Sequence, residues 1–129
     1  MATDGKKTIL VVEDEAMILD SYSEILSAAD FVVHKANDGA VGLEQADKHK
    51  ENIDLMLLDL MMPGVDGLIV LDSVQKDKAK YGTYPILVLT NLSSESVIKE
   101  AFNRGATGYI MKTELQPDKL VDEVNKFLV

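Results

Sequence analysis

The chain has 129 residues, of which 13 are Lys or Arg and 22 are Asp or Glu, so its formal net charge is −9 at pH 7. This length suits one domain with a single core, and the excess negative charge repels phosphate backbones, which argues against direct nucleic-acid binding. No cysteine is present, which excludes disulfides, thiolate metal sites and a cysteine nucleophile.

The first seven residues are small, polar or charged, and we expect them to form a flexible leader before a domain that covers residues 8–129. Thr8 to Val12 is a β-branched, apolar run that is typical of a strand. Glu13 ends this run, which is far shorter than a signal-peptide core or a membrane span. We therefore expect a cytoplasmic protein with no membrane insertion.

Helical and strand patterns alternate along the rest of the chain. Four more strands are predicted, over 31–36, 55–59, 84–90 and 107–111. Five helices are predicted as well: over 16–29, from the Asn37-Asp38 cap to about 50, over 68–79, from Ser93 or Ser94 to Gly105, and from Pro117 onward. His34 and His49 share no spacing with another metal-ligand type, so we expect both to be exposed and solvated. Five strands alternating with five helices predict a doubly wound parallel α/β sheet.

The stretch from Leu55 to Gly67 contains four apolar residues that lead directly to Asp59, followed by a turn rich in Pro and Gly. The apolar run is too short and too uniform for an amphipathic helix, so it indicates a strand that is covered on both faces. Ligands bind outside the carboxyl ends of the strands in such sheets, which makes Asp59 a site candidate. An ordinary role as a helix cap is the alternative for this aspartate alone.

Polar residues also follow the other predicted strands: Glu13 and Asp14 after the first, Thr90 at the end of the fourth and Lys112 after the fifth. Each is unremarkable by itself, but together with Asp59 they should meet at one edge of the sheet. Clustered carboxylates raise one another's pKa unless a cation neutralises them, and oxygen ligands without histidine or cysteine favour Mg²⁺. A lysine and a hydroxyl beside them can hold a phosphoryl group.

Four motifs in this order, Val-Val-Glu-Asp-Glu, Leu-Leu-Asp-Leu-Met-Met-Pro-Gly-Val-Asp-Gly, Val-Leu-Thr and Gly-Ala-Thr-Gly-Tyr-Ile-Met-Lys, resemble the response-regulator receiver domain of two-component signalling. The resemblance extends from about Thr8 to the C-terminus and is to a single-domain receiver of the chemotaxis type. It implies a flavodoxin-like fold with strand order 2-1-3-4-5. It also implies a phosphoprotein with a signalling role.

The resemblance implies that Mg²⁺ is the cofactor. Asp14 and Asp59 would bind the ion directly, the backbone carbonyl of Met61 would be a further ligand, and Glu13 would act through a water molecule. Asp59 would also be the phosphoacceptor. The phosphodonor would be a histidine kinase or a histidine phosphotransfer protein, and the downstream target would be a protein that the sequence does not identify.

The resemblance also implies a switch. Thr90 and Lys112 would hold the phosphoryl oxygens, Thr90 would move toward them, and Tyr109 would turn inward into the vacated space. The face formed by the fourth helix, the fifth strand and the fifth helix of the predicted order would then change and bind a partner. Two states that differ by only a few kcal/mol suffice for such a response.

Two features depart from the family pattern. Thr113 follows Lys112 where the family usually has proline, and we expect a trans bond between them, because a cis bond before a non-proline residue costs about 3–4 kcal/mol. Met61 and Leu92 are apolar where a polar side chain could orient an attacking water, and Asn91 narrows the approach to Asp59. We therefore expect a long-lived phosphorylated state.

Other functions are possible for this set of residues. A small Mg²⁺-dependent phosphatase of the aspartyl-phosphate type would need an Asp-x-Asp nucleophile after the first strand, where this chain has Glu13-Asp14-Glu15. A flavin carrier would need a phosphate-binding loop there, and the acidic residues have the wrong charge. We expect a stand-alone receiver that is not an enzyme beyond slow self-dephosphorylation. A relay intermediate, a phosphate sink and an interaction module remain alternatives.

Overall fold

The computed structural model describes residues 5–62, 64, 66–91, 95–112 and 116–128. In chain order the elements are β1 (Thr8–Val12), α1 (Ala16–Ala28), β2 (Val32–Ala36), α2 (Gly39–His49), β3 (Leu55–Asp59), α3 (Gly67–Lys76), α4 (Lys78–Tyr81), β4 (Ile86–Thr90), α5 (Glu95–Asn103), β5 (Gly108–Met111) and α6 (Pro117–Lys126). None of the helices in these ranges has the length and apolarity that a membrane crossing needs.

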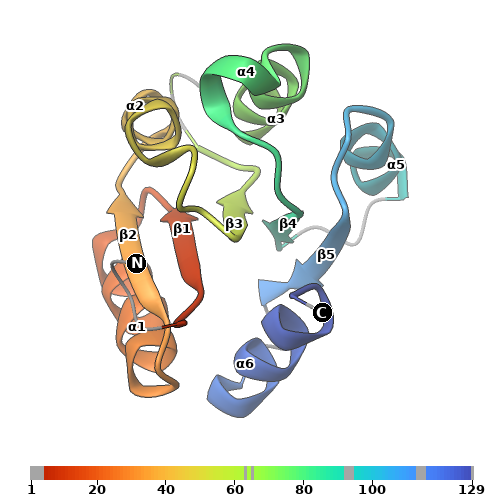
Figure 1. Ribbon diagram of the computed structural model, residues 1–129. Helices are drawn as coiled ribbons and strands as arrows, with labels where there is room; N and C mark the ends of the chain where they lie inside the picture. The colour runs from red at the N-terminus through yellow and green to blue at the C-terminus, as the bar shows by residue number, and fades with distance from the viewer. Residues whose placement is uncertain (1–4, 63, 65, 92–94, 113–115, 129) are drawn as a thin grey trace.

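The five strands form one parallel sheet in the order β2-β1-β3-β4-β5, which confirms the predicted fold class and strand order. Figure 1 shows α1 and α6 on one side of this sheet and the other helices on the opposite side. Every residue of the three central strands, β1, β3 and β4, is buried. This explains why their sequences are apolar throughout instead of alternating.

The sheet separates two hydrophobic clusters. One contains Leu10, Met56 and Val88 from the strands together with residues of α2 and α3. The other contains Val11 and Leu57 together with residues of α1 and α6. Neighbouring residues of one strand thus enter different clusters, because successive side chains of a strand point to opposite faces.

The structure has six helices among the described residues, so the prediction of five was wrong by one short helix. The predicted helix over 68–79 ends at Lys76, and Asp77 then caps a separate turn of helix, α4. The Asp77 side chain accepts a hydrogen bond from the Lys80 N–H at 3.2 Å. A side chain that bonds to the backbone in this way competes with helix continuation, which explains the break.

One expected core residue lies at the surface. The helical spacing of Val97, Ile98, Ala101 and Phe102 predicts that all four face the core. However, 43% of Phe102 is exposed, while its neighbour Ala101 is fully buried. The Phe102 ring instead meets the edge of the Tyr109 ring on the outer strand β5, with 6.3 Å between centroids. Because β5 is the last strand of the sheet among the described residues, no other described strand extends the core beneath Phe102.

Gly67 allows α3 to begin directly against the end of β3. A Cβ atom at this position would lie 2.3 Å from the Asp59 carbonyl oxygen and 2.5 Å from the Leu60 Cα atom, so any side chain would force backbone atoms apart. The Gly67 N–H donates a hydrogen bond to the Leu60 carbonyl at 3.2 Å. This contact fixes the loop that follows Asp59.

Candidate functional site

The carboxyl ends of four strands carry the polar residues that the sequence singles out. Asp59 and Thr90 are the last residues of β3 and β4, while Glu13 and Lys112 directly follow β1 and β5. Glu13 and Thr90 are completely buried, and only 3% of Asp59 is exposed. The prediction that acids of the first and third strands meet the lysine of the fifth is therefore confirmed by geometry.

Lys112 lies between two buried carboxylates. Its Nζ atom is 2.7 Å from Glu13 Oε1 and 3.5 Å from Asp59 Oδ2, and only 8% of its side chain is exposed. Apart from this ion pair with Lys112, Glu13 Oε1 has no hydrogen-bond partner among the described residues. Lys112 thus pairs mainly with Glu13, and its ammonium group lies farther from the Asp59 carboxylate.

Backbone N–H groups orient the other carboxylate oxygens. The Met61 N–H donates to Asp59 Oδ1 at 3.1 Å, and the Glu15 N–H donates to Glu13 Oε2 at 3.2 Å. Both donors lie two residues after their acceptor, in the loop that each strand enters. The loops therefore fix the two acids before any ligand is present.

The charges of the site do not balance. Burial raises the pKa of Asp59 to about 7, the neighbouring Glu13 contributes to this increase, and Lys112 opposes it. Burial alone would lower the pKa of Lys112, but Glu13 and Asp59 outweigh this effect and raise it. One lysine therefore faces two buried acids, with Asp14 as a third acid beside them.

These acids fit a hard divalent cation. Glu13, Asp14 and Asp59 each offer a carboxylate oxygen, and these oxygens lie within 4.8 Å of one another. Asp14 is half-buried, so the cluster is open to solvent on one side. Clustered carboxylate oxygens, one of them lacking a hydrogen bond, suit Mg²⁺, which takes oxygen ligands and retains several waters.

The raised pKa of Asp59 predicts how stability responds to pH. A carboxyl group whose pKa is higher in the folded chain than in the unfolded chain stabilises the fold at low pH and loses this effect as the pH rises through the folded value. Without divalent cation, the free energy of unfolding should fall by about 1 kcal/mol between about pH 6 and about pH 8 because of Asp59. Urea unfolding of the wild type beside Asp59→Asn measures this difference.

Addition of Mg²⁺ should reverse the loss at the higher pH, because an ion that binds only the folded chain stabilises it. Asp59→Asn should show neither the Asp59-dependent decrease nor the same gain from Mg²⁺. An identical pH dependence in the two proteins would contradict the raised pKa of Asp59.

Of the other predicted residues, Tyr109 and Met61 have exposed side chains, and two more lie outside the described residues. The Tyr109 side chain is 44% exposed and points away from the sheet toward Phe102. The Met61 side chain is 60% exposed, and Leu60, Met61, Met62 and Asp66 line a surface hollow of about 320 Å³ beside Asp59. Thr113 and Leu92 lie outside the described residues, so the expectations of a trans bond and of slow hydrolysis stay predictions.

Tyr22 of α1 is a residue near the site that the motifs did not reveal. Burial raises the pKa of its hydroxyl, and Lys112, Glu13 and Asp59 are close enough for their charges to act on it. It is 8% exposed and belongs to the cluster between the sheet and α1. The helical spacing of Ile18, Tyr22 and Ile25 predicts that Tyr22 faces inward, but spacing alone cannot show that it lies near the strand ends.

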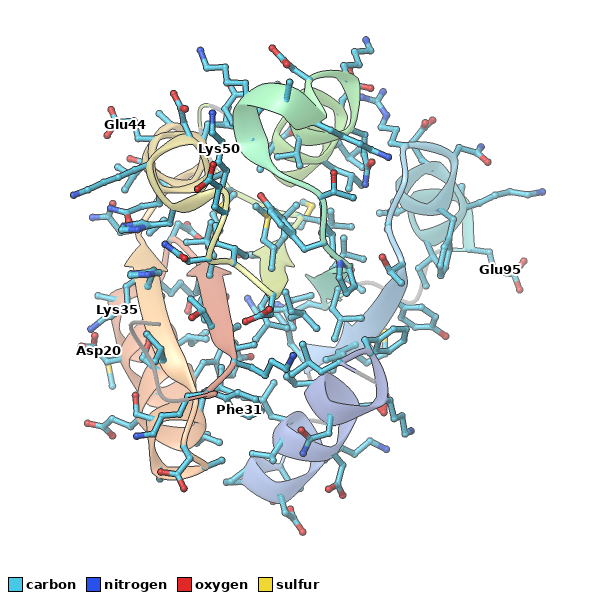
Figure 2. The ribbon with its side chains drawn as sticks, in the orientation of Figure 1. Asp20, Phe31, Lys35, Glu44, Lys50 and Glu95 are labelled. Carbon is cyan, nitrogen blue, oxygen red and sulfur yellow. The ribbon has the colours of Figure 1, made fainter. Side chains whose placement is uncertain are left out.

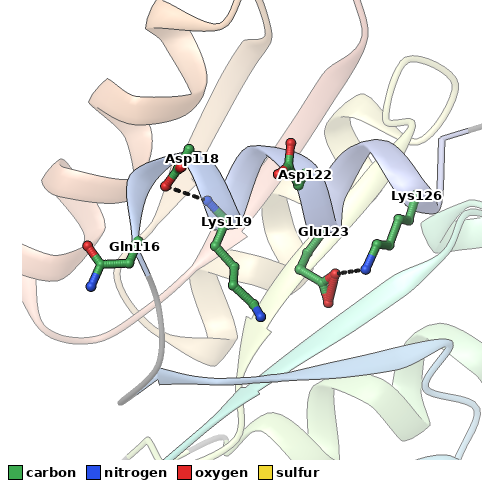
Figure 3. Close-up of a pocket in the computed structure, with 6 residues that line it drawn as sticks. All are labelled: Gln116, Asp118, Lys119, Asp122, Glu123 and Lys126. Atoms are coloured by element: carbon green, nitrogen blue, oxygen red, sulfur yellow. Dashed lines mark hydrogen bonds and ion pairs between the residues drawn. The ribbon is translucent and has the colours of Figure 1, made fainter.

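The hollow drawn in Figure 3 has a volume of about 360 Å³ and lies elsewhere, along the outer side of α6. It is lined by residues of α6 and its cap, namely Gln116, Asp118, Lys119, Asp122, Glu123 and Lys126. Most of these side chains are exposed, and none belongs to the buried carboxylate cluster. The candidate site is therefore the strand-end cluster.

Comparison with known proteins gives consistent results. The family model of the response regulator receiver domain matches residues 9–125. The nitrate/nitrite response regulator NarL of Escherichia coli is 32% identical over 128 residues, covering 98% of this chain and 56% of NarL. The transcriptional regulatory protein ResD of Bacillus subtilis is 36% identical over 132 residues, covering 99% of this chain and 50% of ResD. The chain thus spans about half the length of these curated relatives.

Solved structures agree with the sequence relatives. Chemotaxis protein CheY4 of Vibrio cholerae superposes with a TM-score of 0.87 at 29% identity, covering 96% of this chain and 100% of that one. A chain of the CheX-CheY-BeF3-Mg²⁺ complex of Borrelia burgdorferi gives a TM-score of 0.84 at 26% identity, covering 95% and 90%. The family match, the CheY-like fold and the cluster at the strand ends lead to one conclusion: this chain belongs to the response regulator receiver domains of two-component signalling.

Proposed function

We propose that this receiver, formed by residues 8–129 with residues 1–7 as a leader, accepts a phosphoryl group on Asp59 and passes the signal to a protein partner. The observation that carries the proposal is the buried group of Glu13, Asp59 and Lys112, in which Asp59 is the only acid that ends a strand and also faces the lysine. A carboxylate in such a place is suited to forming an aspartyl phosphate.

The transfer would proceed from a phosphohistidine of a kinase or a phosphotransfer protein. An Asp59 carboxylate oxygen bonds to phosphorus while the bond between phosphorus and the donor's imidazole nitrogen breaks, and the electron pair of that bond stays on the imidazole. Little else is required of the protein except positioning and neutralisation of charge. Lys112 supplies positive charge beside Asp59, and Thr90 supplies a hydroxyl at the end of the adjacent strand.

Asp14, Asp59 and the Met61 carbonyl would hold Mg²⁺, and we place Glu13 behind them, acting through water. Bound Mg²⁺ would neutralise charge on the phosphoryl oxygens. Two observations support this arrangement: the three acids cluster at one point, and the hydrogen bond from the Met61 N–H to Asp59 Oδ1 keeps the Met61 backbone close to Asp59. The Borrelia burgdorferi complex contains BeF3 and Mg²⁺ with a related fold, which supports the same choice of ion here.

The output would use the face formed by α5, β5 and α6. Tyr109 lies on this face in an exposed position, so an inward turn would change its surface. Phosphorylation would draw Thr90 toward the phosphoryl group and leave space for the tyrosine ring. A relay or phosphate-sink role would use the same acceptor but would not need this change.

The experiment that tests the proposal separates a switch from a phosphatase. Incubation with acetyl phosphate and Mg²⁺ should add one phosphoryl group per chain, with only slow release of phosphate afterwards. Incubation with p-nitrophenyl phosphate should give no sustained turnover. Many turnovers per chain would instead favour the phosphatase-type enzyme and overturn the proposal.

A further inference from the structure

His34 and His49 form a stacked pair at the sheet edge opposite β5. Their ring centroids lie 3.9 Å apart, and the ring planes differ by only 8°. Both residues are half-buried, so the expectation that they are exposed and solvated was wrong. The sequence could not show this contact, because it joins the edge strand β2 to the last residue of α2.

The charges that act on His34 are positive. Lys48 and His49 of α2 are the charged groups that act on His34, and β1 places the apolar Leu10 beside it. No described carboxylate forms an ion pair with either ring. Lys35, the next residue of β2, forms an ion pair with Asp20 of α1, and Figure 2 shows these two side chains near each other. Successive side chains of a strand alternate, so this ion pair lies on the opposite face of β2 from His34.

The stacked pair joins β2 to α2, and α2 is in turn connected to β1 and β3, two strands that end at the site. The His49 carbonyl accepts hydrogen bonds from the Asn52 and Ile53 N–H groups, so the end of α2 is continuous with the turn before β3. Nearer its start, α2 packs at Gly42 directly against Val12, the residue before Glu13. The stack is thus one contact near the C-terminal end of α2, and Gly42 is one near its other end.

Two parallel rings in contact tolerate one positive charge but not two. Burial lowers the pKa of His34, and the charges of His49 and Lys48 lower it further. Histidine is the side chain that ordinarily changes charge between about pH 5 and about pH 8, and burial with positive neighbours shifts the protonation of His34 toward lower pH. Repulsion at this separation favours opening of the stack when both rings are charged.

We propose that the stacked His34–His49 pair is a proton-controlled clamp: it holds the C-terminal end of α2 against β2 while at most one ring is charged, and it releases this end when both rings are charged. The clamp stabilises the fold at neutral pH. Its contribution is lost as the pH falls, because the unfolded chain then binds more protons than the folded chain.

NMR titration of both histidines together with the backbone amides tests this proposal. In the wild type the His34 pKa should be lower than in His49→Phe by at least about half a unit, because phenylalanine keeps the stack but carries no charge. Lys48→Gln serves as the control for the adjacent lysine and should change the His34 pKa less. The Asn52 and Ile53 amides should shift with the second protonation in the wild type and not in His49→Phe.

Equal His34 pKa values in the wild type and His49→Phe would overturn the proposal, as would amides of residues 52 and 53 that do not respond to the second protonation. If the variant fails to fold, the wild type alone decides. Two histidines that titrate independently at ordinary pKa values exclude the clamp. Asp59 contributes equally in every protein compared, so its own titration does not affect the result.

Discussion

Replacement of Lys112 by methionine should lower the free energy of unfolding by about 3–5 kcal/mol at neutral pH without divalent cation, because removal of one partner of a buried ion pair leaves an uncompensated buried charge. Glu13 is completely buried, and Lys112 is the only described cation in contact with it. Proton uptake by Asp59 would offset part of the cost. Urea unfolding measures the difference.

Lys99→Met is the matched control, because Lys99 is exposed and forms no ion pair among the described residues. Its effect should stay within about 0.5 kcal/mol. Glu13→Gln combined with Lys112→Met should recover most of the stability lost in Lys112→Met. Equal losses in Lys112→Met and Lys99→Met would show that the buried pair does not stabilise the folded protein.

Replacement of Asp14 by asparagine should raise the dissociation constant for Mg²⁺ by at least about 10–100-fold. Loss of an outer residue that only hydrogen-bonds to a metal ligand already has an effect of this size. Asp14 is the half-buried member of the acid cluster and thus the one that an ion reaches from solvent. The change should have little effect on stability without Mg²⁺, because it does not touch the Glu13–Lys112 pair. Isothermal titration calorimetry measures the dissociation constant.

Asp66→Asn is the control for this measurement. Asp66 lines the hollow beside Asp59, but its side chain caps α3 by accepting the Ile69 N–H at 3.0 Å, a role that asparagine can keep. Its Mg²⁺ affinity should match that of the wild type. If Asp14→Asn binds Mg²⁺ as tightly as Asp66→Asn does, the ion is held elsewhere.

The site residues at the strand ends could be predicted from the sequence, because all strands of a parallel sheet end at the same edge. Apolar runs identify the buried strands, and the residue after each run must lie at the carboxyl edge. Asp59, Thr90 and Lys112 were located in this way, and Asp38 was recognised as a helix cap, which the structure confirms. Strand order required the family resemblance, because periodicity does not show which strands are neighbours.

The features that could not be predicted depend on contacts between elements. Whether Lys112 pairs with Glu13 or with Asp59 is decided by differences of less than 1 Å in the folded chain. Helical spacing placed Phe102 inward, but its burial depends on what lies beyond the edge strand. The break at Asp77 results from a side-chain cap that competes with a continuous helix, and residue patterns do not show which of the two is more stable.

Intact-mass analysis after treatment with acetyl phosphate tests directly whether Asp59 is the phosphoacceptor of a Mg²⁺-dependent site. We expect a single phosphoryl adduct on the wild type with Mg²⁺, and none on Asp59→Asn or after chelation of the ion. Asp54→Asn, at a carboxylate that accepts the Thr8 N–H at the opposite end of the sheet, should be labelled like the wild type. An adduct that forms equally on Asp59→Asn would show that the phosphoryl group is attached elsewhere, and one that forms equally without divalent cation would show that the reaction does not depend on Mg²⁺.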